Sequence, residues 1–104
     1  MDYKKVTAII PFLALDKVKG QLKKLDIGGL SVSEVKGFGD YKNYYSEDEM
    51  TVNYKIEIFT PADKVEEISS AIMDAAHTGM MEDGIVAILP VEKLYRIRNR
   101  AEYS

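Results

Sequence analysis

The sequence contains no cysteine, and this absence excludes several kinds of chemistry at once. Without cysteine the chain can form no disulfide framework, no thiolate nucleophile and no cysteine-ligated zinc site, and the redox compartment cannot be read from it. Long hydrophobic runs are also absent. No apolar stretch approaches the roughly 20 residues of a membrane-spanning helix, and the start at Met1 lacks a basic-then-apolar signal segment. We therefore expect a soluble cytoplasmic protein.

A strong excess of one charge is missing as well. Fourteen basic and 17 acidic residues leave a net charge of −3. This balance gives no support to a general nucleic-acid binder held by phosphate contacts, although it leaves room for one local basic site. We therefore expect no nucleic-acid partner.

Histidine is scarce, and the single one argues against an enzyme. His77 lies between Ala76 and Thr78 at the expected end of a helix, where a histidine interacts favourably with the helix dipole. No nucleophile and base pair is evident around it in the sequence. We therefore expect no enzyme, no prosthetic group and no metal site.

What the sequence does contain is a clear hydrophobic periodicity. Its 104 residues, 46% of them hydrophobic, suffice for one domain with one core, expected to span residues 1–104. Alternating or β-rich runs predict four strands, at residues 4–12, 29–39, 52–59 and 85–90.

Two helices are expected between these strands. Helical spacing predicts the first from Asp16 to the Gly28-Gly29 pair. The second is expected to start with Thr60 as the capping residue and Pro61 at the first helical position, and to end at Gly79. The order βαββαβ is the ferredoxin-like α+β pattern, an antiparallel sheet with two helices on one face.

The connection between the second and third strands is long. A hairpin needs roughly two to five residues, whereas the polar, tyrosine-rich excursion that follows the second strand here covers residues 40–52. Loops of this length without structure of their own are usually functional or disordered. Its acidic run SEDE at 46–49 is consistent with a metal or a basic partner surface, but we expect a solvated loop tip.

A local basic site is indicated near the end of the chain. If residues 94–98 are extended, Arg96 and Arg98 point to the same side and present two guanidinium forks suited to phosphate or carboxylate. The alternative is a solvated face with loose surface ion pairs. Gly37, Gly39 and Gly84 would let backbone N–H groups approach phosphate oxygens, or they are simply turn residues.

The residues KGFG at 36–39 raise an alternative of another class. The RNA-recognition domain shares the βαββαβ order, and its main motif begins with these letters followed by an aromatic residue. Here the next residue is Asp40, and the motif ends the second strand instead of lying on the third. RNA binding is therefore kept only as a remote alternative.

Four segments resemble, in order and spacing, the PII signal-transduction proteins: SVSEVKGFG at 31–39, KIEIFTPAD at 55–63, HTGMMEDGI at 77–85 and YRIRN at 95–99. The AIIPFLALDKV start fits the same pattern, so the resemblance covers nearly the whole chain. It implies a homotrimer of ferredoxin-like subunits whose inter-subunit clefts bind adenine nucleotides. It also implies that residues 40–52 form the T-loop, the arm that docks into partner proteins, and that a basic tail follows at 94–104.

The resemblance implies a site, residue by residue. The base is expected near Ile9, Glu57 and Phe59, with Gly29, Leu30 and Ser31 reaching in from the neighbouring subunit. The phosphates are expected near Gly37, Phe38, Gly39, Asp83 and Gly84, gripped by Arg96 and Arg98. The partner-binding loop is expected to present Tyr41, Lys42, Tyr44, Tyr45, Glu47 and Asp48.

The chain departs from the family pattern at several charged positions. The family's TGKIGDGK reads TGMMEDGI here, so lysines give way to Met80 and Ile85, and a glycine to Glu82. Asp40 follows GFG, and Asn53 stands where the family has a lysine that binds 2-oxoglutarate. Uncompensated phosphate charge beside added carboxylates is repelled. We therefore expect ADP or AMP to be favoured over ATP.

The T-loop is also shorter than the family's, and the family's uridylylation segment has no counterpart. This predicts a divergent PII-like regulatory protein that signals to a membrane transporter or a carbon-metabolism protein, with bicarbonate as a candidate co-ligand. The alternative is a standard nitrogen-regulatory PII protein that senses ATP, ADP and 2-oxoglutarate.

Overall fold

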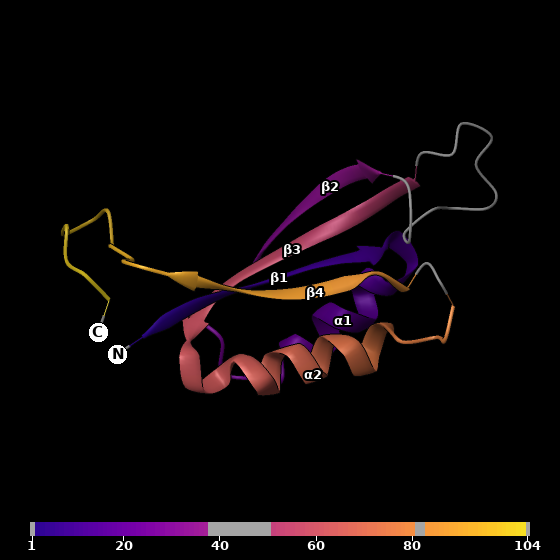
Figure 1. Ribbon diagram of the computed structural model, residues 1–104, viewed down its shortest axis with the longest axis horizontal. Helices are drawn as coiled ribbons and strands as arrows, with labels where there is room; N and C mark the ends of the chain where they lie inside the picture. The colour runs from indigo at the N-terminus through magenta and orange to yellow at the C-terminus, as the bar shows by residue number, and fades with distance from the viewer. Residues whose placement is uncertain (1, 38–50, 81–82, 104) are drawn as a thin grey trace.

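The computed structural model describes residues 2–37, 51–80 and 83–103. Within them, four antiparallel strands form one sheet in the order β2-β3-β1-β4, and two helices lie against one face of it (Figure 1). The strands are β1 (Tyr3–Pro11), β2 (Ser31–Gly37), β3 (Thr51–Pro61) and β4 (Ile85–Val91). The helices are α1 (Leu15–Leu22) and α2 (Val65–Ala76), each preceded by a short 3-10 turn. The predicted ferredoxin-like βαββαβ fold is confirmed.

The core lies between the sheet and the helices, because each strand turns alternate side chains toward them. The most deeply buried residues are Val6, Ala8, Ile10, Ile56 and Ile58 from the sheet and Val18, Leu22, Ile68 and Ile72 from the helices, none more than 1% exposed. The helical members are four residues apart in each helix, so they share one face. Removing this apolar surface from water is the main contribution to the stability of the fold.

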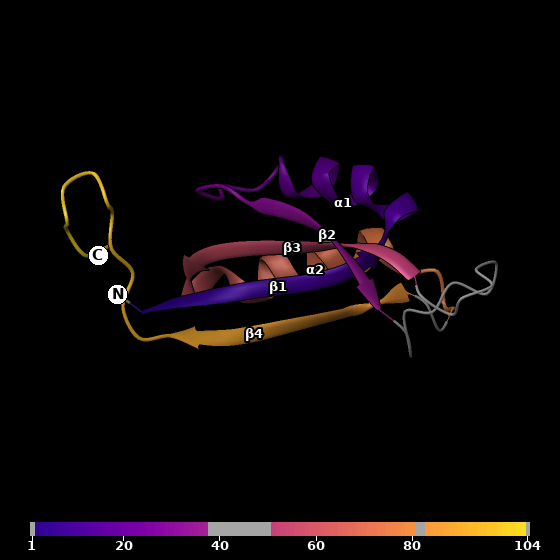
Figure 2. The same cartoon turned by 90° about the horizontal axis from the view of Figure 1, so that it is seen from above.

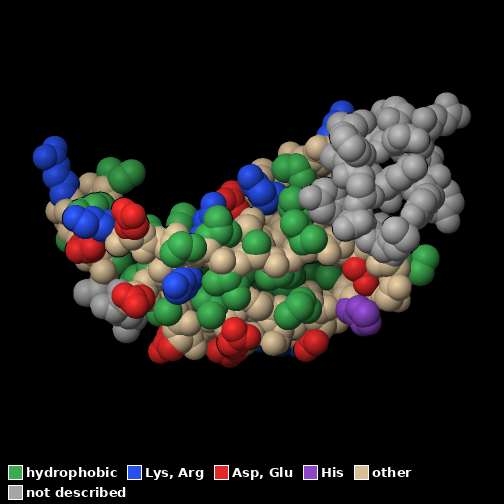
Figure 3. All heavy atoms as spheres, viewed as in Figure 1, with side chains coloured by type: hydrophobic (Ala, Val, Ile, Leu, Met, Phe, Trp, Pro, Cys, Tyr) green, Lys and Arg blue, Asp and Glu red, His purple; other side chains and the backbone are tan. Residues whose placement is uncertain are grey.

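The opposite face of the sheet carries no helix in the described part of the chain (Figure 2). The register pairs Glu57 with Ser31 across β3 and β2, so these two side chains share this face. Phe59, Ile85 and Leu89 also lie on it, with 47%, 45% and 39% of their surface exposed. Figure 3 shows hydrophobic side chains gathered along β4, the edge strand that faces the viewer. This face therefore combines apolar and polar groups that the single chain leaves uncovered.

The third strand is longer than predicted at both ends. Thr60 and Pro61 were expected to begin the second helix, but they pair with Lys4 and Tyr3 as the last residues of β3. Thr60 is buried and continues the alternation of the strand, and its hydroxyl donates to the Pro61 carbonyl at 3.3 Å instead of capping a helix. At the other end, Thr51 belongs to the strand, so the described strand takes the last two residues assigned to the T-loop.

Both helices are shorter than predicted. α1 ends at Leu22, and the next residues tighten into a turn in which Lys24 and Leu25 donate to carbonyls three residues earlier. Leu25 still packs against the core from this turn. α2 ends at Ala76, because His77 is extended, and Gly79 lies beyond it with a φ of 86°. Neither helix is long and apolar enough to cross a membrane, as judged over the described residues.

Candidate functional site

The described site residues fall into two groups at opposite ends of the sheet. Residues 29–31, Glu57 and Phe59 line a pocket at the end where both chain termini lie (Figure 1). Ile9, Gly37, Asp83 and Gly84 lie toward the other end, where β2 ends and β4 begins. Seven residues of β4 separate Gly84 from the tail, roughly 23 Å of strand at about 3.3 Å per residue.

The first group surrounds a cavity of about 450 Å³, which we call the tail pocket. Its walls come from the loop before β2, the end of β3 and the residues after β4, and its rings are Tyr3, Phe59, Tyr95 and Tyr103. Residues 29–31 were expected to arrive from a neighbouring subunit. Within one chain they line the same pocket as Glu57 and Phe59. That they reach the nucleotide from a neighbouring subunit stays a prediction.

Glu57 is the acceptor of the tail pocket, and two lysines hold it ionised. The ammonium of Lys5 donates to Glu57 Oε2 at 2.8 Å, and Lys55 Nζ lies 3.8 Å from Oε1. The hydrogen bond from Lys5 is the largest cause of the lowered pKa of Glu57. The carboxylate therefore stays an acceptor at neutral pH and has lone pairs left for a ligand hydroxyl or amine.

An ion pair closes the rim of this pocket. Lys64, which precedes α2, donates to the Asp26 carboxylate at 3.2 Å and to the Asp26 carbonyl at 3.0 Å. This contact holds the loop that contains Gly28 and Gly29 against the start of the second helix. The loop is thus tied to the turn that directly follows β3, the strand that carries Glu57.

The tail adopts a turn instead of the extended run on which the paired-arginine prediction depended. Residues 97–99 form the turn, and Arg96 N–H donates to the Ala101 carbonyl at 2.8 Å. Asn99 Oδ1 accepts from Ala101 N–H at 2.9 Å, and Arg100 has a φ of 59°. The prediction that Arg96 and Arg98 project side by side from a strand is therefore wrong. Arg96 instead stacks on Tyr103, with its guanidinium carbon 4.0 Å from the ring centroid.

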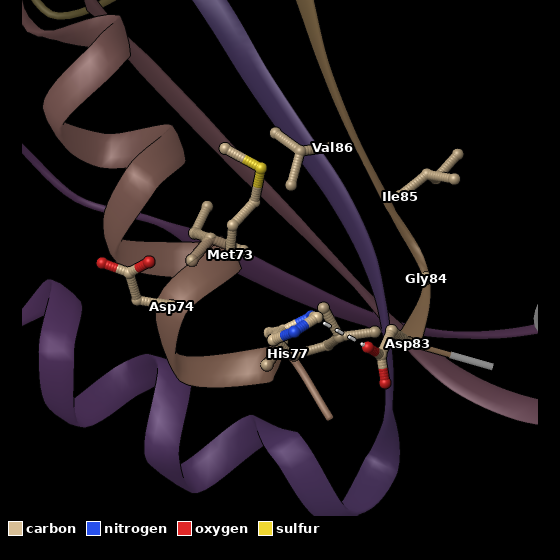
Figure 4. A pocket seen from close by; sticks show the side chains of 10 residues that line it. Met73, Asp74, His77, Asp83, Gly84, Ile85 and Val86 are labelled. Carbon is tan, nitrogen blue, oxygen red and sulfur yellow. Dashed lines mark ion pairs between the residues drawn. The ribbon is translucent and has the colours of Figure 1, made fainter. Parts of the chain in front are cut away.

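At the other end, Asp83 organises the segment that follows α2. Its carboxylate accepts from the backbone N–H of Thr78 at 2.8 Å and of Gly79 at 2.9 Å, and also from the Thr78 hydroxyl. His77 Nδ1 lies 3.4 Å from the same group (Figure 4). The Thr78 hydroxyl bond is the largest cause of the lowered pKa of Asp83. The Asp83 side chain is thus held by hydrogen bonds from its own loop. His77, which follows the last residue of α2, lies beside the same carboxylate.

Gly84 is required by close packing of β4 on β1. Its φ is 101°, and a Cβ atom at this position would lie 1.9 Å from the Ile9 carbonyl oxygen. No side chain fits so close to a neighbouring backbone. Position 84 is therefore a glycine because of close packing as well as its backbone conformation. The same contact brings Ile9 and Gly84 together.

A second cavity of about 390 Å³ lies between α2 and β4. Ile72, Ala76 and Val86 form apolar parts of its wall, and Asp74 and His77 lie at its edge (Figure 4). Asp83 and Gly84, from the expected phosphate group, line it as well.

Several predicted residues lie outside the described part of the chain. These are Phe38 and Gly39 of the expected phosphate group, and Tyr41, Lys42, Tyr44, Tyr45, Glu47 and Asp48 of the expected partner-binding loop.

The contributors to the tail pocket that sequence reasoning missed include Lys5, Lys64, Tyr3 and Tyr103. Lys5 carried a usable signal, because its place on β1 puts it on the same sheet face as Glu57. Tyr103 carried none, since its contact with Arg96 depends on the turn at 97–99.

Comparison with known proteins agrees with this fold. Residues 3–101 match the model of the family described as nitrogen regulatory protein P-II. The chain is 41% identical over 102 residues to the nitrogen regulatory protein P-II of Azospirillum brasilense and 42% identical over 102 residues to that of Nostoc punctiforme, covering 91% of each chain in both cases. The crystal structure of Arabidopsis thaliana PII bound to citrate superposes with a TM-score of 0.84 at 33% identity, covering 98% of this chain and 89% of that one.

The fold and these matches define a regulatory protein of ferredoxin-like architecture. The chain belongs to the nitrogen regulatory protein P-II family. The resemblance predicted from its residues is thereby confirmed. Proteins of this family transmit signals and are not enzymes, as the sequence predicted.

Proposed function

We propose that this protein is a regulatory nucleotide sensor that binds ADP or AMP in preference to ATP in clefts between three copies of the chain. One observation carries the proposal. Glu57 and Phe59, which are suited to the base, and the two tail arginines lie at one end of the subunit, whereas Ile9, Gly37 and Gly84 lie toward the other. A nucleotide that uses both groups needs a second copy of the chain, whose loop end meets the tail pocket of the first.

The uncovered sheet face supports the association of copies. Phe59, Ile85 and Leu89 present a broken apolar surface there, beside the ion pair of Lys5 with Glu57. Covering this face in a homotrimer would remove apolar area from water and bring neighbouring subunits to the tail pocket.

The charge at the loop end supports the preference for fewer phosphates. Met80 and Ile85 stand where the family has lysines, and the carboxylate of Asp83 is already satisfied by its own loop. Among the described residues, the basic side chain that the structure places beside Asp83 is the imidazole of His77, which is 75% exposed. A third phosphate would bring charge to a region with little to compensate it.

The output of the sensor is the T-loop, residues 40–52, which we propose docks into a membrane transporter or a protein of carbon metabolism. Bicarbonate is the co-ligand we favour over 2-oxoglutarate. Asn53 is buried and neutral where the family has the lysine for 2-oxoglutarate, which supports this choice. The competing function is that of a standard nitrogen-regulatory protein that senses ATP, ADP and 2-oxoglutarate.

Calorimetric titration of the purified protein with AMP, ADP and ATP, each with and without bicarbonate or 2-oxoglutarate, tests the proposal. Tighter binding of ADP or AMP than of ATP, altered by bicarbonate and unaffected by 2-oxoglutarate, is the expected result. Tightest binding of magnesium-ATP together with 2-oxoglutarate would establish the competing function instead.

A further inference from the structure

Three side chains from opposite ends of the sequence meet beside the tail pocket. Tyr3 is the first residue of β1. In the tail, Arg96 lies just before the turn at 97–99, and Tyr103 lies after it. The rings of Tyr3 and Tyr103 are 5.6 Å apart between centroids and meet edge to face at 68°. The guanidinium carbon of Arg96 lies 4.0 Å from the Tyr103 centroid. We call these three residues the aromatic clamp.

The Tyr103 ring is fixed from several directions. Its backbone N–H donates to the Leu94 carbonyl at 2.8 Å, and the residues before it pair across the turn through the bridge of Tyr95 with Glu102. Tyr3 is held in the sheet between Pro61 and Val91. Edge-to-face packing on such a support favours one ring orientation. Arg96 thus stacks on a ring that has little freedom of its own.

This stack leaves the hydrogen-bonding edge of Arg96 available. A guanidinium over an aromatic face is attracted by the ring quadrupole, while its N–H donors point outward in its own plane. No ion pair within the described ranges uses Arg96 or Arg98. The two arginines differ, because Arg98 lies in the turn and has no ring beneath it. Arg96 is therefore the more preorganised anion-binding group of the tail.

We propose that Tyr103, supported by Tyr3, is a positioning residue that holds Arg96 for the phosphate of a nucleoside phosphate bound at the tail pocket. This inference rests on the proposed nucleotide-binding function. Immobilising a long cationic side chain before binding lowers the entropic cost of its contact with the ligand. Tyr103 therefore contributes to affinity for phosphorylated ligands without contacting the phosphate.

The test compares Tyr103→Leu with Tyr103→Phe in the full chain, using calorimetric titration with ADP and with adenosine as probes. Tyr103→Leu removes the ring and should weaken ADP binding about fivefold more than adenosine binding, as expected for loss of a cation–π contact that supports only the phosphate contact. Tyr103→Phe keeps the ring and should restore ADP affinity to within about twofold of the original. In an Arg96→Ala background, Tyr103→Leu should have no further effect, since both changes remove one contact.

Each other outcome has a definite meaning. Equal weakening of ADP and adenosine would limit Tyr103 to its place in the pocket wall and overturn its positioning role. Tighter ADP binding by Tyr103→Leu would show that the ring withholds Arg96 from the ligand, which also overturns the proposal. Failure of the unaltered protein to bind ADP would overturn the proposed function itself. Unaltered ADP binding by Tyr103→Leu would overturn the aromatic clamp alone.

Discussion

At the scale of single residues, two carboxylates in the described part of the chain have lowered pKa values for different reasons. Asp83 is stabilised by a hydroxyl and two backbone N–H groups of its own loop. Glu57 is stabilised by the ammonium groups of Lys5 and Lys55. The carboxylate of Asp83 thus accepts hydrogen bonds that order its own loop. The carboxylate of Glu57 lies at a pocket and has lone pairs left for a ligand. The sequence marked both residues for the ligand and did not distinguish these roles.

The contacts of Asp83 predict a pH-dependent contribution to stability. Because the pKa of Asp83 in the folded chain lies below its ordinary value of 3.8, its stabilisation is complete above that value and is lost as the pH falls through the folded-state pKa. Asp83→Ala should lower the free energy of unfolding by about 1–2 kcal/mol at pH 7. Urea unfolding should find this difference smaller at a pH of about 2. The exposed Asp74→Ala serves as control, and a difference independent of pH for Asp83→Ala would contradict the assignment.

Phosphate selectivity is predicted to depend on position 85. Ile85 is 45% exposed at the start of β4, next to Gly84, so a longer side chain has room there. Ile85→Lys would return a cation to the loop end and should improve the affinity for ATP about tenfold more than that for AMP. Ile88→Lys, on the other face of the same strand, should favour neither nucleotide. An equal gain for ATP and AMP from Ile85→Lys would rule out selection by phosphate number at this position.

At the scale of elements, the sequence predicted the number, type and order of strands and helices, because the hydrophobic periods of two and of three to four residues are unambiguous in most segments. It failed where two local signals compete. Thr60-Pro61 fits a helix start, yet Thr60 also continues the alternation of β3, and pairing with β1 decides for the strand. At the tail, alternating arginines fit a strand, but the hydrogen bond from Ala101 to Asn99 stabilises a turn.

Substitution by alanine should have opposite effects on stability at two glycines, because Gly84 is packed against β1 and a side chain added at Gly20 would meet no neighbour. Gly84→Ala would force a Cβ atom against the Ile9 carbonyl at a strained φ of 101°, so the free energy of unfolding should fall by about 3 kcal/mol or more. Gly20→Ala, in α1 with no atom within 4 Å of the added group, should raise it by about 0.5–1 kcal/mol. Chemical denaturation of both variants measures the difference. A tolerated Gly84→Ala would contradict the close approach of the two strands.

At the scale of the whole molecule, the candidate site is divided. Glu57 and the tail arginines lie at one end of an elongated subunit, 48 Å in its longest dimension, and Gly37 and Gly84 lie toward the other. Sequence similarity named most members of this set, but it did not show that residues 29–31 share a pocket with Glu57 and Phe59 in one chain, since spacing along the chain carries no information about which ends meet. The antiparallel pairing of the strands determines which ends meet. It places one part of the candidate site at each end of the subunit, and we call these parts half-sites.

Complementation between two defective chains tests this division most directly. One chain carries Arg96→Ala and Arg98→Ala, which remove the tail cations. The other carries Gly37→Asp, which places a carboxylate at the loop end. Each alone should assemble normally and bind ADP at least about tenfold more weakly, through loss of charge-assisted contacts or through repulsion. Co-expressed with different tags and purified through both tags as mixed trimers, they should regain roughly a third of the original high-affinity sites, because one of the three inter-subunit sites then joins two unaltered half-sites. Mixed oligomers that bind no ADP with the original affinity would show that a single chain holds the whole site.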